Sequence, residues 1–404
     1  MNYKEALAWL YSLQRFGIKL GLENIRRLID ELGIDLSDAR VIHVAGTNGK
    51  GSVCAMIDSI CRAQKYRTGL FISPHLVTFR ERIRVNGEMI LAKDVATGLT
   101  MIQKLVADWE PHPTFFEITT ALSLKHFAEA KIDVVIFETG LGGRLDATNA
   151  VQSNVSVITP IALDHEKWLG DSLDKIASEK AGIIKPRTPV VFAPQIPAAE
   201  RVIRARADDC EAPLHFVEQP YKKSTIALRG EHQKLNAAIA IAALRAAKVD
   251  IGNAAIARGL AKVEWPARFQ CWDKRTVIDG AHNPAAARIL VETWREVFGD
   301  ERATLILAVL SDKDLRGICE ALAPIGGFVL LPKIRSERAA DSNALQKIFV
   351  DLGCESKIFS SFADAFGKAG QRSSRILITG SLHFAGEALA YLRGEPAAFE
   401  ECGQ

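Results

Sequence analysis

Short apolar runs alternate along the chain with longer segments in which apolar residues recur at the spacing of a helix. The runs predict strands at 41–44, 68–72, 134–137, 155–158, 190–192, 276–278, 305–310, 328–331 and 375–379. Helical patterns lie between them, among them those at 52–64, 233–247 and 284–297. Because strands that alternate with helices build βαβ units, we expect an α/β fold with mostly parallel sheets.

The pattern changes near 268–273, and we place a domain boundary there. An alanine-rich helical segment ends before this point, and a new series of strands and helices begins at Thr276. We therefore predict a larger domain over residues 1–268 and a smaller one over residues 269–404. The 404 residues of the chain are enough for two hydrophobic cores.

The composition narrows the classes of function. The 51 basic and 48 acidic residues give a formal charge of +3 without a basic cluster, which argues against a nucleic-acid partner. The longest apolar stretch, 237–244, is far shorter than the ~18 residues of a membrane span, and no signal peptide is visible. The seven cysteines include no CxxC pair. We therefore expect a reduced, cytoplasmic protein without a membrane partner or a cysteine-bound metal.

A glycine-rich turn, Gly-Thr-Asn-Gly-Lys-Gly-Ser at 46–52, lies between the first predicted strand and a helical pattern. Backbone N–H groups at such a helix N-terminus close on phosphate oxygens, and Lys50 adds positive charge. Ser52 can offer its hydroxyl to Mg²⁺. Gly51 separates Lys50 from Ser52, so the spacing differs from the common GxxxxGK[ST] pattern. The order of strand, turn and helix favours ATP binding over a purely structural turn.

Polar residues also follow two other predicted strands. Glu138 ends the run 134–137 and precedes a glycine-rich turn, and Asp164 and His165 come just after another strand. The carboxyl ends of parallel strands line the ligand crevice, so a carboxylate there is well placed for Mg²⁺. These segments alone leave an alternative open, in which Glu138 caps a helix or pairs with Arg144 and His165 is structural.

Lys180 lies on the apolar face of a helix predicted over 171–184. The residues that share this face at helical spacing are Leu173, Ile176, Ala177 and Ile184. Burying an ammonium group is costly unless it is paired or chemically changed. The pattern alone favours a lysine that reaches solvent or pairs with Asp174 or Glu138. The alternative is a lysine carbamylated by CO₂, which would be a carboxylate-like metal ligand.

Taken together in order and spacing, the motifs resemble those of the bacterial dihydrofolate synthase/folylpolyglutamate synthase family, within the Mur ligase superfamily. The blocks that carry the resemblance run nearly end to end. They are FGIKLGLE at 16–23, HVAGTNGKGSV at 43–53, SPHL at 73–76, RERI at 80–83, TFFE at 114–117, GLGGRLDATN at 140–149, LDH at 163–165, EKAGII at 179–184, RFQ at 268–270, DGAHNP at 279–284, DKD at 312–314 and TGS at 379–381.

The resemblance implies a fold and a reaction. It implies an N-terminal, P-loop-type mononucleotide-binding domain with a mostly parallel sheet and a folate site, followed by a smaller, Rossmann-like C-terminal glutamate-ligase domain. The reaction would be an ATP-dependent ligation through an acyl phosphate, with L-glutamate and either dihydropteroate or a reduced folate as substrates. Two Mg²⁺ sites are implied, with room for a monovalent cation. A monomer whose domains close over the substrates is expected.

The matching motifs also imply roles for residues. The ATP-binding residues would be Asn48, Gly49, Lys50, Gly51, Ser52, Asn236, Arg268 and Asp279. The ligands of the first Mg²⁺ would be Ser73 and Glu138, and those of the second His165 and carbamylated Lys180. The catalytic residues would be Lys50, His165, Lys180 and His282, with His282 near the reacting phosphate.

The pterin-bearing substrate would lie against two segments. Their residues are Thr114, Phe115, Phe116, Glu117, Leu145, Asp146 and Ala147. Phe115 or Phe116 would stack on the flat ring, and the alternative is that at least one of them is an ordinary core residue.

The chain departs from the family pattern at three places. Ala267 stands where a glycine often precedes the arginine, Glu166 and Lys167 follow the Asp-His pair, and Leu310 and Ser311 precede the block at 312–314. None of these changes removes an implied ligand.

Three other classes of function fit the sequence less well, and one narrower activity stays open. A peptidoglycan-building Mur ligase would need a further domain before Gly46, where this sequence has 45 residues. A P-loop NTPase switch fits poorly with the position of Gly51 and with Lys180 on an apolar face. An inactive binding protein conflicts with the intact set of implied ligands. A synthase that only lengthens the glutamate tail of folates stays open beside the dual enzyme.

Overall fold

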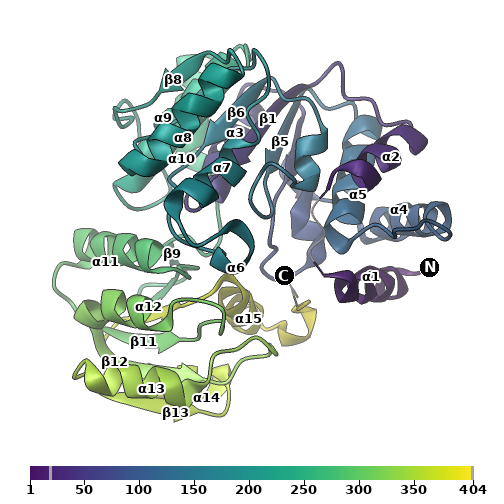
Figure 1. Ribbon diagram of the computed structural model, residues 1–404. Helices are drawn as coiled ribbons and strands as arrows, with labels where there is room; N and C mark the ends of the chain where they lie inside the picture. Colours follow the sequence, from purple (N-terminus) through teal and green to yellow (C-terminus); the bar gives the residue numbers. More distant parts are fainter. Residues whose placement is uncertain (18–20, 402–404) are drawn as a thin grey trace.

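The structure, a computed structural model, describes residues 1–17 and 21–401. It contains an eight-stranded sheet and a six-stranded sheet, each covered by helices (Figure 1). The predicted α/β fold with two domains and mostly parallel sheets is confirmed. Part of the block 16–23 lies outside the described residues.

The first sheet has the strand order β4-β3-β2-β5-β1-β6-β7-β8. Its strands are β1 (Arg40–Ala45), β2 (Thr68–Phe71), β3 (Ile83–Val85), β4 (Glu88–Met89), β5 (Val134–Glu138), β6 (Val155–Ile158), β7 (Val190–Phe192) and β8 (Leu214–Phe216). All neighbours pair in parallel except β2–β3 and β3–β4. In this sheet, the strands missed from the sequence are β3, β4 and β8, which are short and partly exposed and so lack an apolar run.

Helices cover both faces of this sheet. They are α1 (Tyr3–Ser12), α2 (Glu23–Glu31), α3 (Lys50–Ala63), α4 (Ala92–Leu105), α5 (Phe115–Glu129), α6 (Glu166–Leu169), α7 (Leu173–Ala181), α8 (Pro197–Asp209), α9 (His232–Ala246) and α10 (Asn253–Lys262). Short 3₁₀ helices are η1 (Leu13–Phe16), η2 (Phe79–Arg82) and η3 (Ala147–Ala150). Alternate residues of β1 point to opposite cores, Val44 to the one under α3 and α9 and Val41 to the one under α1, α4 and α5.

Residues from Ala267 onward belong to the second domain, since Ala267 packs in its core and its carbonyl accepts from the amide of Gly280. The sheet of this domain has the order β13-β12-β11-β14-β10-β9. Its strands are β9 (Gln270–Cys271), β10 (Thr276–Ile278), β11 (Ala303–Leu307), β12 (Gly326–Pro332), β13 (Ser356–Phe359) and β14 (Ile376–Thr379). Its helices are α11 (Pro284–Phe298), α12 (Leu315–Leu322), α13 (Ser342–Asp351), α14 (Phe362–Gly370) and α15 (Leu382–Leu392), with η4 (Ala323–Ile325) and η5 (Pro396–Ala398). The strand predicted at 305–310 instead ends at Leu307, because residues beyond it leave the ladder with β12 and β14.

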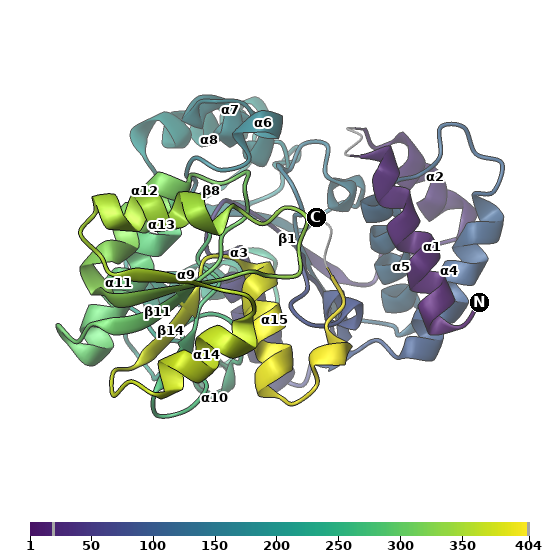
Figure 2. The same ribbon diagram turned by 90° about the horizontal axis from the view of Figure 1, so that it is seen from below.

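The two domains meet near the carboxyl ends of β1, β5 and β6, which are neighbours in the first sheet. Figure 2 shows α15 and the segment that follows it running back toward the first domain. In the part of the chain that the structure describes, no helix is both long and apolar enough to span a membrane.

Candidate functional site

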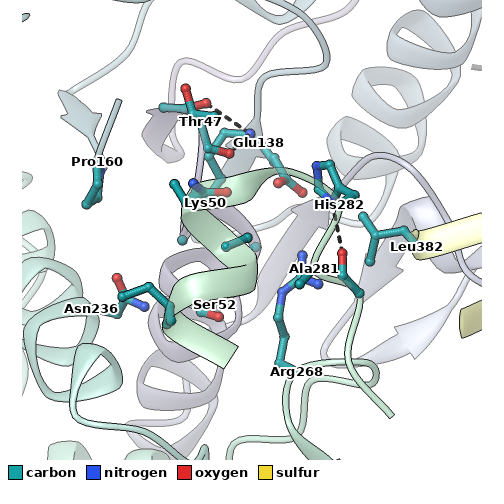
Figure 3. A pocket seen from close by; sticks show the side chains of 18 of the residues that line it. Thr47, Lys50, Ser52, Glu138, Pro160, Asn236, Arg268, Ala281, His282 and Leu382 are labelled. Carbon is teal, nitrogen blue, oxygen red and sulfur yellow. Dashed lines mark hydrogen bonds between the residues drawn. The ribbon is translucent and has the colours of Figure 1, made fainter. Parts of the chain in front are cut away.

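A cavity of about 520 Å³ lies between the two domains and is lined by residues of both. Lys50 and Glu138 reach it from the first domain, and Arg268 and His282 from the second (Figure 3). The sequence-predicted residues that line it are Asn48, Gly49, Lys50, Gly51, Ser52, Ser73, Glu138, His165, Lys180, Asn236, Arg268, Asp279 and His282. The segments 114–117 and 145–147 do not line it.

The phosphate loop is shaped by left-handed backbone at Gly46 (φ +147°) and Gly49 (φ +89°), the latter being the N-cap of α3. The ammonium of Lys50 donates to the carbonyl oxygens of Gly46 (3.0 Å) and Thr47 (3.1 Å). Free amides at the start of α3 and this lysine together favour an anion. The loop has the local geometry of a phosphate site.

Gly51 is fixed by a close approach. A Cβ atom there would lie 2.7 Å from Nε1 of Trp265, which also lines the cavity. This explains in steric terms why a glycine stands between Lys50 and Ser52. The buried hydroxyl of Ser52 accepts from Nε2 of Gln233 at 3.4 Å. Sequence reasoning missed both Trp265 and Gln233.

Glu138 ends β5 with its carboxylate buried beside the loop. Burial raises the pKa of Glu138, against the opposing charges of Lys50 and Arg268. The backbone N–H of Ser73 donates to its Oε2 at 3.3 Å. Arg144 pairs with Glu179 at 2.8 Å, so the alternative in which Arg144 pairs with Glu138 is wrong.

Lys180 is buried on α7, and its ammonium donates to the carbonyl of Gly46 at 2.9 Å. Burial, together with the charge of Lys50, lowers the pKa of Lys180 to about 7. Within residues 1–17 and 21–401, Lys180 forms no ion pair, and Asp174 instead approaches Arg201 at 3.8 Å. The pairings with Asp174 and Glu138 that the sequence pattern favoured are therefore wrong.

Asp164 bridges the domains beside His165. Its Oδ1 accepts from Nζ of Lys313 at 2.6 Å, and its Oδ2 accepts from Nδ2 of Asn283 at 3.3 Å. Nε2 of His282 lies 3.6 Å from the same carboxylate. Burial alone would raise the pKa of Asp164, but the charges of His282 and His165 in their protonated forms and of Lys313 hold it well below its usual range. Sequence reasoning gave none of these bridging roles, although Asp164 and Lys313 both belong to noted motifs.

The pKa values of His165 and His282 both lie below the ordinary value of histidine, although 39% of the His165 side chain is exposed to solvent. The pKa of His165 falls to about 4, mainly through burial, and burial likewise lowers the pKa of His282. Nδ1 of His282 lies 2.8 Å from the carbonyl oxygen of Gly280. A neutral imidazole can ligate a metal or accept a proton, which an imidazolium cannot.

The remaining residues predicted to bind the nucleotide line the same cavity as the phosphate loop. Nδ2 of Asn236 donates to Gln233 at 3.0 Å, and Arg268 lines the cavity from the second domain. Asp279 accepts from the amides of Phe269 (2.7 Å) and Ala281 (2.8 Å), which holds the turn after β10. Burial raises the pKa of Asp279, and Arg268 opposes this.

The predicted pterin-binding residues have structural contacts. Thr114 and Glu117 form a capping box at the start of α5, and the ring of Phe115 stacks on Tyr11 with centroids 5.6 Å apart. Phe115 is thus a core residue, as one alternative held. Asp146 accepts from the amides of Gly140 and Leu141, each at 2.9 Å.

The other members of these segments differ in burial. Phe116 is half-buried and packs so close to Gly140 that a Cβ there would lie 2.5 Å from its ring. Ala147 is buried and Leu145 half-buried. Phe116 is therefore the better placed of the two phenylalanines to meet a flat ligand.

Among the described residues, no group of three or more His, Cys, Asp and Glu side chains is placed to hold a metal ion. Mg²⁺ commonly takes one or two protein carboxylates and completes its shell with water and phosphate oxygens. The buried carboxylate of Glu138, which receives one long hydrogen bond, fits such a site.

Each of the two domains matches a known family model. Residues 44–205 match the family model of the Mur ligase middle domain, and residues 267–382 that of the Mur ligase, glutamate ligase domain. The chain is 35% identical to the dihydrofolate synthase/folylpolyglutamate synthase of Bacillus subtilis, with 95% of this chain and 97% of that one covered.

Solved structures agree with this. FolC of E. coli, in complex with DHPP and ADP, has a TM-score of 0.86 at 32% identity, covering 96% of this chain and 98% of that one. A bifunctional folylpolyglutamate synthase/dihydrofolate synthase from Yersinia pestis, complexed with AMPPNP and Mn ion, has a TM-score of 0.88 at 31% identity, covering 97% and 98%.

Proposed function

The chain belongs to the dihydrofolate synthase/folylpolyglutamate synthase family of Mur ligases, and from this premise we propose how its site works. It is an ATP-dependent ligase that forms an amide between a pteroate or folate carboxylate and glutamate. The resemblance drawn from the motifs is thereby confirmed. ATP and a divalent metal ion take part in the reaction.

The observation that carries the proposal is the convergence of both domains on one cavity. Lys50 and Glu138 of the first domain share it with Arg268 and His282 of the second. A carboxylate substrate repels a triphosphate, so cations from two sides are needed to hold the reacting groups in line. Closure of the domains over the cavity also keeps water from the reactive acyl phosphate.

The triphosphate is held by the loop over 48–52. The amides at the start of α3 and the ammonium of Lys50 neutralise its charge. Asn236 on α9 and Arg268 in the second domain contact the phosphates of ATP, and Asp279 contacts its nucleoside.

Two Mg²⁺ sites complete the centre, one at Ser73 and Glu138 and the other at His165 and Lys180. Bound metal ions supply charge that offsets the repulsion between carboxylate and phosphates. His165 fits because its imidazole, with a pKa of about 4, is uncharged at neutral pH. Lys180 fits as a carbamate, because a neutral amine adds CO₂, losing one proton and gaining a carboxylate.

The reaction has two steps. An oxygen of the substrate carboxylate attacks the γ-phosphorus of ATP, and ADP leaves. The amine of L-glutamate then attacks the acyl carbon, loses a proton, and phosphate leaves. His282 lies beside the reacting phosphate, where a neutral imidazole held by the carbonyl of Gly280 can take up a proton.

The substrate range is the finer part of the proposal. The pterin ring lies against 114–117 and 145–147, with Phe116 as its stacking partner, and both dihydropteroate and reduced folates are used. We also propose that the enzyme works as a cytoplasmic monomer and that a monovalent cation takes part.

One experiment tests this function. Phosphate release from Mg·ATP and L-glutamate is measured with 7,8-dihydropteroate in one reaction and tetrahydrofolate in another, with mass spectrometry of the products. Release and added glutamate in both reactions support the dual enzyme. Release with tetrahydrofolate alone restricts it to the tail-lengthening synthase. If folded protein that binds ATP releases no phosphate in either reaction, the substrate assignment is overturned.

A further inference from the structure

The segment after α15 returns to the first domain and pairs with the loop over 73–79. The backbone N–H of Glu400 donates to the carbonyl of Val77 at 2.8 Å, and Nε2 of His75 lies 3.0 Å from the carbonyl oxygen of Glu400. Both views show this segment beside the loops near α1 (Figures 1 and 2). Two segments more than 300 residues apart are thus joined by one backbone–backbone bond and one bond from a side chain, since Glu400 and His75 are 325 residues apart.

The tautomer of His75 follows from its neighbours. Nε of Arg82 donates to Nδ1 of His75 at 2.8 Å, because a guanidinium has only donors. Nδ1 is therefore the acceptor, and the proton is on Nε2, which donates to the Glu400 carbonyl. The buried His75 is fully used in holding the two segments together.

Four consecutive backbone amides, those of residues 76–79, donate to two carboxylates, and one of these carboxylates is that of Glu400. Glu81 accepts from the backbone N–H groups of Leu76 (2.9 Å), Val77 (3.0 Å) and Thr78 (3.2 Å). The next amide, that of Phe79, donates to Oε2 of Glu400 at 2.6 Å. Without Glu400, one amide of the row would lose its acceptor.

The same oxygen of Glu400 accepts from two hydroxyls. The hydroxyl of Thr78 donates at 3.1 Å, and that of Tyr3 on α1 donates at 3.2 Å. Hydrogen bonds to a charged acceptor are about twice as strong as neutral ones. Glu400 therefore connects α1 and the loop to the second domain through one half-buried carboxylate.

Helix α15 also packs directly against the loop over 73–79. A Cβ atom on Gly386 would lie 1.9 Å from the carbonyl oxygen of Leu76, so the helix and the loop backbone are in direct contact. Phe399 packs edge-on against His383 of α15, with ring centroids 5.0 Å apart. The loop thus lies between α15 and the segment 399–401.

This loop carries Ser73 and Leu76 into the cavity. On its far side, Phe79 packs edge-on against Phe115 at 6.5 Å, next to the segment assigned to the pterin ring. A displacement of the loop would therefore move a proposed metal ligand and the support of a proposed substrate site together.

We propose that Glu400 is a positioning residue of this ligase, which ties the second domain to the loop over 73–79 and so places Ser73 at the metal site. The role assigned to Ser73 rests on the proposed function, whereas the restraint of the loop does not. The alternative is an ordinary packing contact between domains.

The test uses the full chain with three substitutions. Glu400→Ala removes the carboxylate, Glu400→Gln keeps one oxygen as an acceptor, and Glu401→Ala is the control because Glu401 is exposed and next in the chain. Hydrogen exchange over 74–80 is measured without ligands. Mn²⁺ affinity is then measured by electron paramagnetic resonance with AMPPNP bound, so that neither measurement needs turnover.

We expect Glu400→Ala to speed exchange of the Phe79 amide and to weaken Mn²⁺ binding, each about tenfold, as for loss of a charge-assisted hydrogen bond. Glu400→Gln should recover only part of both effects, because a neutral amide oxygen is a weaker acceptor than a carboxylate, and Glu401→Ala should match the parent. Unchanged exchange in Glu400→Ala would overturn the restraint. Faster exchange with unchanged Mn²⁺ affinity would leave only a packing contact and overturn the positioning role.

The two proposals fail in different ways. If the parent protein binds no Mn²⁺ with AMPPNP, the proposed metal site is wrong, and faster exchange in Glu400→Ala still upholds the restraint. Should Glu400→Ala not fold, as judged by circular dichroism, the comparison of Glu400→Gln with Glu401→Ala decides the matter. Equal exchange and equal Mn²⁺ affinity in those two variants would then overturn the proposal.

Discussion

Asn48 of the phosphate loop and Asn283 of the second domain donate a hydrogen bond to each other, at 3.4 and 3.1 Å. Asn283 is also the N-cap of α11, where its Oδ1 accepts from the amide of Ala286 at 2.8 Å. The start of α11 and the loop that holds phosphate are therefore linked directly, so domain position and nucleotide binding should depend on each other.

Replacing Asn283 by alanine tests this link. Loss of the cap should cost about 1 kcal/mol of unfolding free energy. The control Asp341→Ala removes the cap of α13, an exposed site far from the loop, at a similar cost. We expect only Asn283→Ala to raise KM for ATP in steady-state assays. Equal KM values in the two variants would show that the loop is placed without Asn283.

A second prediction concerns the contact between Gly51 and Trp265. Gly51→Ala should destabilise the protein by about 1–3 kcal/mol, as overpacking does, and weaken ATP binding because the loop must shift. Thermal unfolding and calorimetric titration with ATP measure both effects. Adding Trp265→Phe, which removes the indole nitrogen, should restore part of the loss.

The control for Gly51→Ala is Gly367→Ala in α14, where no atom outside the helix's own backbone lies within 4 Å of the added Cβ. It should leave ATP binding unchanged and stabilise the helix by up to about 1 kcal/mol. If Trp265→Phe does not improve Gly51→Ala, the clash with the indole is not the reason for the glycine.

How much the sequence predicts depends on the range of the interaction. Buried strands and the loop around Gly49 were predictable because apolar runs and a glycine-rich turn are local signals. Strand β3 was missed because it is only partly buried. The link between Asp164 and Lys313 could not be predicted, since these residues are 149 positions apart and meet only when the domains dock.

The Lys180 segment shows the same limit. Its helical spacing correctly placed the lysine on a buried face, but the partner chosen from the pattern was wrong. The acceptor is instead the carbonyl oxygen of Gly46, a residue with a positive φ in the loop before α3. Every residue has a backbone carbonyl, so the sequence does not indicate which carbonyl accepts from a buried lysine.

A third prediction follows from His43, which is buried in β1. Its Nε2 contacts Oγ1 of Thr148 at 2.8 Å, and that hydroxyl donates to Asp146, so Nε2 carries the proton. Nδ1 has no partner among the described residues. Burial, with the charge of Lys185, lowers the pKa of His43 to about 3.

Between pH 6.5 and 3 the unfolded chain therefore binds a proton that the folded chain does not. The free energy of unfolding should fall as the pH falls through this window, by up to about 1.4 kcal/mol per pH unit from this group. His43→Gln should flatten the slope in urea titrations between pH 7 and pH 4.5. His215→Gln, at an exposed site on β8, is the control and should keep the parent slope.

The last prediction concerns the carbamate proposed on Lys180. Addition of CO₂ needs the neutral amine, and burial lowers the pKa of Lys180 to about 7. The neutral fraction therefore rises as the pH is raised through about 7, and carbamylation should rise with it. Protein incubated with ¹³C-bicarbonate should give one carbamate signal in the ¹³C spectrum, stronger at pH 8 than at pH 6.

Lys180→Ala should abolish that signal. Lys175→Ala, on the same helix, should retain it, because Lys175 is exposed and already paired with Asp171 at 2.8 Å. Glu138 lies across the cavity, and a carbamate would give the site a second anionic ligand that the free amine cannot provide. A signal that survives in Lys180→Ala would place the carbamate elsewhere, and the second metal site would then have to be built without Lys180.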